Sequence, residues 1–434
     1  MAYITPFPGV LYNPKKVGDI ACVVAPPYDV IPPSLQEELY RRSDYNIVRI
    51  ILGKDAPEDT AENNRYTRAA GLWSQWLKEG VLRRDERPAI YVCRDEYSTP
   101  EDGQQVRLGF VAAIRLEDFS RGNVLPHEKT LTGPKADRLH LIRAVGANFN
   151  PIFSFYADPS RKIDPILSMA SKYPPVVRIA DREGVQRTLW RVEEKQAIRD
   201  ITEGMRDHAI FIADGHHRYE TALAFRDEMR KKRGLHVNAP YEYVMMYFIN
   251  IEGTGLTILP VHRVLHHFPH LDKKDLLRRI GMFFDVKRME AIEVLLSAMK
   301  EEAHRENVFG LYLGSPGFFL LRWRGRKVVD DRVERTRSEA WQRLDVTVLH
   351  RILIEHLLGV TSEAEVKGGP IHFTTDARCA VEQVDRGNAQ LVFFLNPTRI
   401  QEVRVVAEQG ETMPQKSTYF YPKLLSGLIM RKIR

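Results

Sequence analysis

The chain has 434 residues, of which 44% are hydrophobic and 28% charged, a composition that excludes a disordered or fibrous protein and leaves an ordinary globular one. Its 64 basic and 57 acidic residues give a formal charge of only +7, interspersed along the chain, which disfavours nucleic acid as a partner. Three cysteines without CxxC spacing, no signal sequence and no long uncharged apolar run predict a cytoplasmic protein without a disulfide framework or a membrane span.

The first half of the chain predicts loops followed by mixed helices and strands. Up to Pro33 we expect loops and a short strand at 20–25, and Ser34 with Glu37 forms a capping-box pattern at the start of a helix. A stronger helix is expected at 61–79 because apolar residues recur there at helical spacing. Strands are then predicted at 89–93, 108–116, 151–156, 176–180, 189–192, 210–213 and 243–250, with helices near 137–144 and after residue 213.

These strands do not alternate regularly with helices, which favours an α+β fold with a mixed sheet. The length favours two domains, with a boundary in the segment 266–272. We therefore predict an α+β domain at 1–268 that carries the active site and a smaller α/β domain at 269–434. The second domain is expected to contain helices at 273–284, 346–358 and 399–409 and strands at 308–313, 317–323 and 391–395.

The densest polar chemistry lies at residues 214–218, Asp-Gly-His-His-Arg, between an apolar strand and a helix. A strand-to-helix turn directs backbone N–H groups and the helix dipole at a ligand, and glycine lets the backbone come close, so phosphate is the expected ligand. Asp214 can cap the helix or coordinate a divalent cation, His216 and His217 can exchange protons, and Arg218 matches phosphate oxygens. The alternative is a capped helix with two surface histidines.

Two further segments mix cations, carboxylates and hydroxyls. Within the segment 125–144, residues 127–138 combine carboxylates with three full cations, as phosphoryl transfer to a hydroxyl requires, although an exposed charged loop is the alternative. In the segment 410–428, the run Lys-Ser-Thr could present an ammonium and two hydroxyls to an anion, but it lacks the glycine spacing of a P-loop, and a structural loop is equally compatible. Their candidate residues are His127, Glu128, Lys129, Thr130, Lys135, Asp137 and Arg138, and Lys416, Ser417 and Thr418.

A fourth, weaker group lies near the N-terminus, in the segments PPYDV and NIVRI, where a prolyl turn and a packed strand are the alternative explanation. Its members are Tyr28, Asp29, Asn46 and Arg49. The sequence contains no Walker A motif, protein-kinase glycine loop, GxSxG or HExxH, which disfavours the standard kinase and hydrolase folds.

Four segments resemble a bacterial and archaeal family catalogued as domain of unknown function 1015: FPGVLYNPKKVGDIACVVAPPYDVI, LPHEKTLTGPKADRL, IADGHHRYETAL and MPQKSTYFYPKL. The motif at 214–218 also resembles one in the ParB and sulfiredoxin-like superfamily, which includes free-serine kinases that use a nucleotide. This second resemblance implies phosphate binding at 214–218, Mg²⁺ held by Asp214, and Glu128 as the general base. Together with the residue groups described above, it gives a predicted catalytic set of Glu128, Asp214 and His217. The predicted phosphate and nucleotide set is Gly215, His216, Arg218, His127, Lys129, Thr130, Lys135, Arg138, Lys416, Ser417 and Thr418, and substrate contacts are predicted at Tyr28, Asp29, Asn46 and Arg49.

The residues and the resemblances together predict a phosphotransferase, a free L-serine kinase that uses ATP or ADP with Mg²⁺ to make O-phosphoserine. A hydrolase of nucleotides or phosphate esters differs only in the acceptor. A ParB-like nucleic-acid protein should carry a concentrated basic surface, and a nucleotide-sensing module should bind without turnover. The sequence fixes neither the phosphate donor nor the oligomeric state.

Overall fold

The computed structural model describes residues 2–100, 103–130, 132–268, 271–303, 307–325, 336–360 and 369–433. They divide into two compact units. The first unit comprises Met1–Pro126, Thr130–Leu256 and Pro422–Arg434, and the second comprises His127–Lys129 and Thr257–Tyr421. The division falls upstream of the predicted boundary at 268, because the strand that follows Leu256 pairs within the second unit. Residues 269 and 270 of the predicted boundary segment lie outside the described residues.

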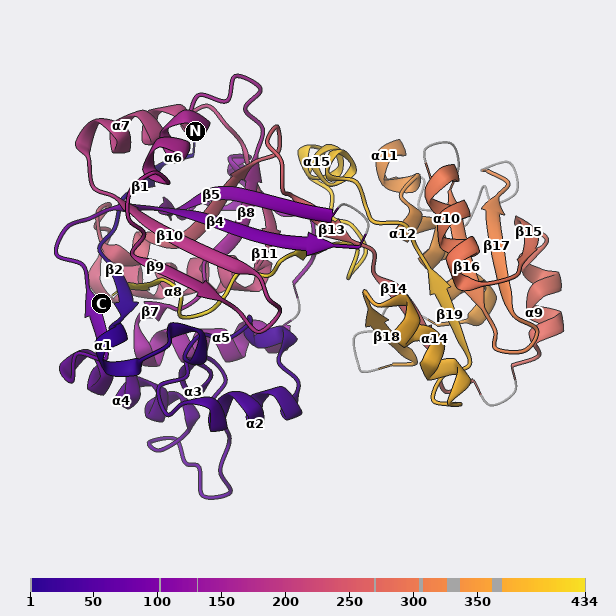
Figure 1. Cartoon of the computed structure of the whole chain (residues 1–434), viewed down its shortest axis with the longest axis horizontal. Coiled ribbons are helices and arrows are strands. Elements are labelled where there is room, and N and C mark those ends of the chain that lie inside the picture. Colours follow the sequence, from indigo (N-terminus) through magenta and orange to yellow (C-terminus); the bar gives the residue numbers. More distant parts are fainter. Residues whose placement is uncertain are drawn as a thin grey trace. The chain divides into compact units, whose positions relative to one another are not determined.

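The first unit is built on a mixed sheet, which contains nine strands in the described part of the chain (Figure 1). Two neighbouring pairs, β6 with β11 and β8 with β12, are parallel, and the other pairs are antiparallel. The α+β prediction is therefore confirmed. The order across the sheet is β6 (Val124–Leu125), β11 (Ile210–Asp214), β8 (Ile152–Tyr156), β12 (Tyr243–Asn250), β5 (Gly103–Arg115), β4 (Ile90–Thr99), β10 (Gln186–Val192) and β9 (Val177–Ala180), with β1 (Ile4–Thr5) paired to β5.

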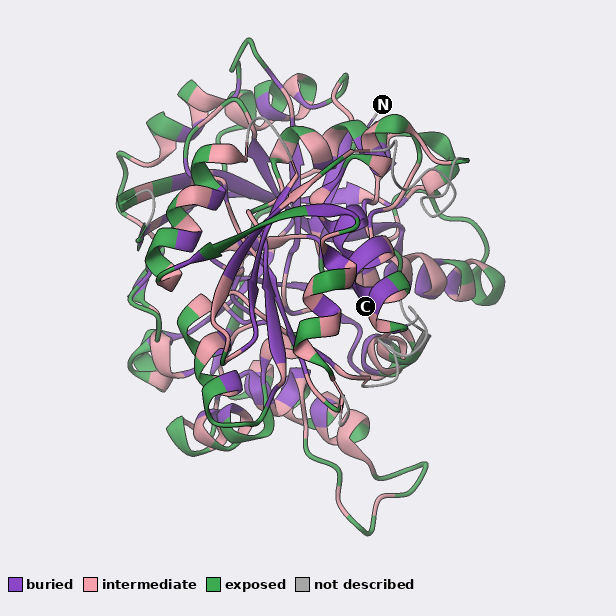
Figure 2. Cartoon of the chain, turned by 90° about the vertical axis from the view of Figure 1, so that its right-hand side faces the viewer, coloured by how far each residue is buried: buried purple, intermediate pink, exposed green. Residues whose placement is uncertain are grey.

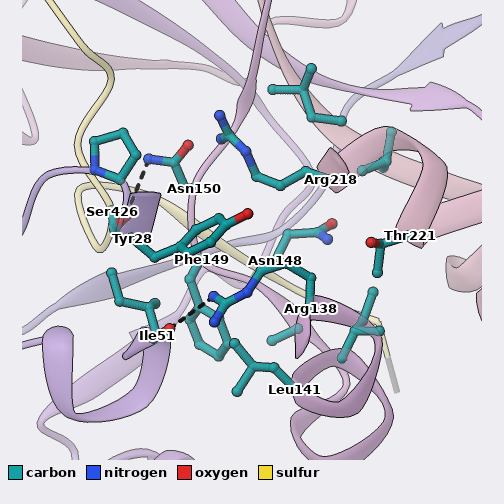
Figure 3. A pocket seen from close by; sticks show the side chains of 15 residues that line it. Tyr28, Ile51, Arg138, Leu141, Asn148, Phe149, Asn150, Arg218, Thr221 and Ser426 are labelled. Atoms are coloured by element: carbon teal, nitrogen blue, oxygen red, sulfur yellow. Dashed lines mark hydrogen bonds between the residues drawn. The ribbon is translucent and has the colours of Figure 1, made fainter. Parts of the chain in front are cut away.

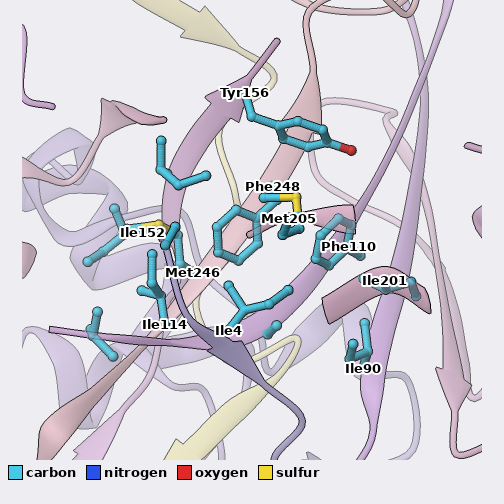
Figure 4. Close-up of a cluster of buried hydrophobic side chains, with 14 of the residues drawn as sticks. Ile4, Ile90, Phe110, Ile114, Ile152, Tyr156, Ile201, Met205, Met246 and Phe248 are labelled. Atoms are coloured by element: carbon cyan, nitrogen blue, oxygen red, sulfur yellow. The ribbon is translucent and has the colours of Figure 1, made fainter. Parts of the chain in front are cut away.

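One face of this sheet holds the main hydrophobic core. Because side chains alternate between the two faces of a strand, alternate residues at 90–92 of β4, 110–114 of β5 and 244–248 of β12 enter this core. The helices α6 (Asp164–Ala170) and α7 (Lys195–Gly204) contribute Leu167 and Ile201 to the same cluster. Figure 4 shows how the strand residues meet Met205, which follows α7. The core includes Ile4, Ile90, Val92, Phe110, Ala112, Ile114, Ile152, Tyr156, Val244, Met246 and Phe248.

A second layer of helices positions the candidate site. The helix α5 (Thr132–Val145) packs against α4 (Arg65–Lys78) and against the long α8 (His216–Arg233). A four-stranded sheet, counted within the described residues, joins both ends of the chain in the order β3 (Leu82–Arg84), β2 (Gly9–Tyr12), β21 (Met430–Lys432) and β7 (Ala147–Asn148). The remaining short elements are α1 (Pro14–Val17), η1 (Ile20–Cys22), η2 (Tyr28–Val30), α2 (Pro33–Arg42), α3 (Val48–Ile51), η3 (Phe119–Arg121) and η4 (Pro240–Glu242).

Three local predictions for the N-terminal region are corrected. The expected strand at 20–25 begins as the 3-10 turn η1, because the side chain of Asp19 accepts a hydrogen bond from the backbone of Ala21. The helix α2 starts at Pro33 without a side-chain cap, so Ser34 lies inside the helix and forms no capping box. The capping box occurs instead at Asn64, one residue before α4, which shortens the predicted helix at 61–79.

The second unit contains an antiparallel sheet, six-stranded within the described residues, in the order β15 (Phe284–Met289), β17 (Phe318–Trp323), β16 (Val308–Tyr312), β19 (Leu391–Phe394), β14 (His262–Leu265) and β18 (Ile371–Thr374). The helices α10 (Ile292–Glu302) and α14 (Ala377–Asp385) pack their apolar residues on it. Further elements are β13 (Thr257–Leu259) paired with β20 (Tyr419–Tyr421), α9 (Lys273–Ile280), α11 (Glu339–Gln342), α12 (Asp345–Val348), the π-helix η6 (Leu349–Leu357) and α15 (Ile400–Glu408).

The predicted helix at 273–284 ends at Ile280, because Phe284 already begins β15. Burial follows the layers of both units: most residues of the sheet strands are buried, whereas the helices also present exposed faces (Figure 2). Among the described residues, no helix combines the length and the apolar character needed to cross a bilayer.

Candidate functional site

The site begins at the turn between β11 and α8. Asp214 ends the strand, and Gly215 precedes the helix with a φ of 94°, in the left-handed region. This backbone conformation favours glycine, and a Cβ atom here would also lie 2.6 Å from a terminal guanidinium nitrogen of Arg218, so that side chain would have to leave its partners Asp214 and Pro151. His216 is buried at the first turn of α8 and His217 is half-buried. The sequence motif thus folds into the strand-to-helix turn that was predicted.

The carboxylate of Asp214 lies between two cations. Its Oδ2 accepts a hydrogen bond from Nη2 of Arg218 at 2.7 Å, and its Oδ1 accepts one from Nζ of Lys423 at 2.8 Å. Burial alone would raise the pKa of Asp214, but Lys423 and Arg218 together hold that pKa well below the usual range of a carboxyl group. Asp214 is therefore a permanent anion that fixes two cations, and not a group that exchanges protons near neutral pH.

This arrangement does not fit the predicted role of Asp214 as a magnesium ligand. Both carboxylate oxygens of Asp214 already accept hydrogen bonds from cations, and a Mg²⁺ ion on either oxygen would lie close to these like charges. Within the described ranges, no group of three or more His, Cys, Asp and Glu side chains is arranged to hold a metal ion. The cation pair instead suits an anionic ligand.

A cavity of about 70 Å³ lies beside Arg218 in the first unit (Figure 3). A second guanidinium, that of Arg138 on α5, lines the same cavity and lies 3.9 Å from the ring centre of Tyr28. In the view of Figure 3 the Tyr28 ring lies between the two arginine side chains. Burial raises the pKa of Tyr28 to about 12, and Asp29 adds to this shift, so its hydroxyl is neutral and can donate a hydrogen bond.

The Arg138 side chain is fixed by its neighbours. Its Nη1 donates to the carbonyl oxygen of Ile51 at 2.8 Å, and its Nε donates to Oδ2 of Asp137 at 2.7 Å. Asp137 also accepts hydrogen bonds from Arg65 and Tyr66 of α4. Burial tends to raise the pKa of Asp137, but Arg138 and these other donors lower it overall, so the carboxyl remains ionised. The cavity wall is therefore rigid and charged.

Two oxygen atoms at this cavity lack a hydrogen-bond partner. They are Oγ1 of Thr221, on α8, and Oδ1 of Asn150, which precedes β8. Buried polar atoms are almost always hydrogen-bonded in folded proteins, so a pair of unsatisfied oxygens at one cavity requires an explanation. A ligand that carries N–H or O–H groups would supply the missing donors.

Next to the cavity, α8 also binds the segment that precedes and begins α5. Glu220 accepts hydrogen bonds from Oγ1 of Thr130 and from Nζ of Lys135, both at 2.8 Å. Lys135 thus lies beside α8, one helical turn beyond His216, but it is already paired with a carboxylate. The sequence did not single out Glu220.

The second unit brings together two other predicted segments. His127 is buried, and its Nε2 lies 3.0 Å from Oγ1 of Thr418. Glu128 is half-buried, and its Oε1 accepts a hydrogen bond from the backbone N–H of Lys416 at 3.3 Å. Ser417 is also buried and donates to the carbonyl oxygen of Pro414. The predicted Lys-Ser-Thr loop therefore does contact the segment that contains the predicted base.

A family model, described as Protein of unknown function (DUF1015), matches residues 4–347. The chain belongs to this family. No match was found among curated proteins.

Several solved structures resemble this DUF1015 chain at low identity. A conserved hypothetical protein from Pyrococcus furiosus aligns with a TM-score of 0.33 and 13% identity over 70% of this chain and 90% of its own. A mutant free serine kinase in complex with ADP aligns with a TM-score of 0.35 and 14% identity over 72% of this chain and 89% of its own. SbnI from Staphylococcus aureus, truncated at its C-terminus, aligns with a TM-score of 0.34 and 11% identity over 73% of this chain and 85% of its own. Similarity at this level does not transfer an activity.

The remaining predicted residues of this DUF1015 chain lie elsewhere. Asn46 is fully buried and bonds the backbone of Cys22, Val24 and Val48, which is a structural role. Arg49 pairs with Asp44 on the surface of the first unit. Asp29 and Lys129 are exposed. None of these four lines the cavity beside Arg218, whereas Tyr28, Arg138 and Arg218 all do.

Lys423 is the functional residue that sequence reasoning missed most clearly. It stands in the segment MPQKSTYFYPKL, which the family resemblance had already marked, but the neighbouring Lys-Ser-Thr run carried the stronger local pattern. Its partner Asp214 is distant in the sequence, so no local spacing could connect the two. Thr221 was likewise missed, because a single threonine in a helix carries no pattern.

Proposed function

We propose that the chain is a small-molecule phosphotransferase that transfers the terminal phosphoryl group of ATP or ADP to the hydroxyl of free L-serine. The observation that carries the proposal is the pair of cations, Arg218 and Lys423, fixed on one ionised carboxylate at the turn before α8. Phosphoryl transfer needs little covalent chemistry from the protein, and most of its catalysis is positioning and neutralisation of charge.

The surroundings of the turn favour an anion further. The N-terminus of α8, an 18-residue helix, contributes the positive end of its dipole, and Gly215 has no side chain that could block access to it. Arg138 adds a third cation at the cavity beside Arg218. Placing cations where phosphate charge accumulates lowers the barrier to transfer, because they are ordered before the reaction starts.

In the proposed reaction, the serine hydroxyl oxygen forms a bond to the terminal phosphorus while the bond from this phosphorus to the bridging oxygen breaks. The hydroxyl proton passes to a carboxylate, for which Glu128 is the predicted base, and the nucleotide leaves with one phosphate fewer. Arg218 and His217 are assigned to the transferring group, and Asp214 positions Arg218 and Lys423. No step is assigned to magnesium, because Asp214 is not arranged to bind it.

The reaction can be tested by phosphorus NMR of the protein with Mg²⁺, ATP or ADP, and a pool of amino acids that contains L-serine. We expect a phosphomonoester signal that requires serine and disappears in His217→Ala. His236→Ala is the matched control, since His236 is exposed beyond the far end of α8 and should leave the signal intact. Free phosphate as the sole product would identify a hydrolase instead, and unchanged nucleotide would refute both reactions.

The base can be tested separately with Glu128→Gln, which retains the shape of the side chain and removes its ability to accept the proton. Turnover should fall by at least about 100-fold, the contribution typical of general base catalysis, while nucleotide binding stays measurable by calorimetry. Glu355→Gln, which removes a carboxylate from a helical ion pair of the same unit, should change neither quantity. Unchanged turnover in Glu128→Gln would exclude this residue as the base.

A further inference from the structure

We infer that the cavity lined by Tyr28, Arg138, Asn150, Arg218 and Thr221 binds a small α-amino acid as a zwitterion, through both its carboxylate and its ammonium group. The inference rests on the proposed function in one respect, that the bound amino acid is then phosphorylated. Arg218 would hold it beside the phosphate-binding turn. The inference goes beyond that function by assigning the acceptor site to particular side chains.

One side of the cavity suits a carboxylate. The guanidinium groups of Arg138 and Arg218 line it from two different helices, and planar guanidinium forks are the side chains best matched to carboxylate oxygens. The phenol of Tyr28 stacks against Arg138 and adds a neutral donor. Three donors that converge from separate segments form a preorganised site for an anionic group.

The other atoms of the cavity require a ligand that also donates hydrogen bonds. The amide of Asn150 has a defined orientation, because its Nδ2 donates to the carbonyl oxygen of Leu424 at 2.8 Å and to Oγ of Ser426 at 3.2 Å. Its Oδ1 therefore remains as an acceptor without a partner. An ammonium group offers three donors and can satisfy this oxygen, which an ionised carboxylate cannot do.

Thr221 provides an independent observation. Its side chain is only 4% exposed and lines the cavity, its Oγ1 has no hydrogen-bond partner, and the hydroxyl points toward the cavity in Figure 3. Leaving a hydroxyl unsatisfied in this way is unfavourable in the free protein, and a polar ligand would remove the penalty. A purely structural position would be occupied equally well by valine.

The cavity size limits the ligand. A volume of about 70 Å³ is roughly five times what one water molecule needs, which suits a small amino acid. We therefore assign this cavity to the acceptor.

Isothermal titration calorimetry without nucleotide tests the site directly. The ligands are L-serine, 3-hydroxypropionate, which lacks the ammonium group, and ethanolamine, which lacks the carboxylate. We expect L-serine to bind and each analogue to bind at least about tenfold more weakly, since each lacks a charged group that the site would recognise.

Thr221→Val removes the unsatisfied hydroxyl and keeps the shape. It should weaken L-serine binding about three- to tenfold, the loss expected for one hydrogen bond, while leaving the thermal stability of the free protein unchanged or higher. Thr347→Val is the matched control, because Thr347 is also buried in a helix with an unsatisfied Oγ1 but lies in α12 of the second unit. It should leave binding unchanged.

The outcomes separate the two proposals. Serine binding that is sensitive to Thr221→Val, without any phosphoserine in the NMR assay, supports the amino-acid site and refutes the kinase reaction. Phosphoserine formation with an unaltered Michaelis constant for serine in Thr221→Val refutes the site and leaves the reaction standing. Equal binding of L-serine and both analogues would also refute the site, because it would show a cavity that does not recognise the ammonium and carboxylate groups together.

Discussion

Replacing Asp214 by asparagine should destabilise the first unit by about 3 kcal/mol. The substitution leaves Arg218 and Lys423 partly buried, with 15% and 14% of their side chains exposed, and without their shared anion. Removing one partner of a fully buried ion pair typically costs about 3–5 kcal/mol, and the residual exposure here places the expected loss at the lower end of that range. At roughly 2–4 °C per kcal/mol for a domain of this size, the melting temperature should fall by roughly 6–12 °C.

The pH dependence gives the sharper test by differential scanning calorimetry. Because the pKa of Asp214 is lower in the folded than in the unfolded chain, its contribution is fully present above the unfolded pKa of about 3.9 and is lost as the pH falls through the folded pKa. The difference between wild type and Asp214→Asn should be constant from pH 6 to 8 and shrink below about pH 4. The control Asp164→Asn, which removes a more exposed pair with Arg161, should cost no more than about 1 kcal/mol. Equal melting temperatures for Asp214→Asn and wild type at pH 7 would refute the ion-pair account.

Two further substitutions test the local geometry. In chemical denaturation, Gly215→Ala should lower the free energy of unfolding by about 1–3 kcal/mol more than Gly122→Ala does. Both glycines have a positive φ, but only at position 215 would a Cβ atom also meet the side chain of Arg218. Equal losses in the two variants would contradict this close approach. In the second unit, burial raises the pKa of Asp345 to about 7, so the folded state binds more protons than the unfolded state between about pH 4 and 7, and stability falls as the pH rises through that window. The free energy of unfolding of Asp345→Asn, measured with urea, should therefore rise relative to that of the wild type as the pH increases from 5 to 8. A difference that is independent of pH would show that this carboxyl is not protonated when folded.

The sequence predicted elements wherever the pattern was local and strong. The strand at 243–250 has the predicted limits; it is a short, almost entirely apolar run that includes the β-forming types Tyr, Val, Phe and Ile. The strand at 210–213 and the helix after it were also predicted, and with them the turn at 214–218. Predictions failed where a weak local pattern was overridden by a stronger preference. Ser34 matched a capping box, but proline is favoured at the first helical position, so α2 starts at Pro33 and includes Ser34.

The candidate site was predictable only in part, for the same physical reason. Tyr28, Arg138 and Arg218 lie in segments whose residues looked unusual on their own, and all three line the cavity. Asn150 and Thr221 are single polar residues in otherwise ordinary segments, and they matter because of what they lack in the folded state, a hydrogen-bond partner. No sequence pattern records an unsatisfied atom, because satisfaction depends on all the atoms that surround it.

Asp214 shows how far the same residue can change its chemistry with its surroundings. An aspartate followed by glycine at the end of a buried strand is compatible with a metal ligand, a helix cap or a partner for cations, and each role predicts a different ionisation behaviour. The decisive contact is the 2.8 Å distance to Lys423, which the C-terminal segment brings into the first unit. With Lys423 and Arg218 both bound, each carboxylate oxygen already faces a cation, which disfavours a divalent cation beside them, and the carboxyl has no tendency to take up a proton near neutral pH. Its remaining role is to hold two cations in place, which is what a site for a transferring phosphoryl group requires.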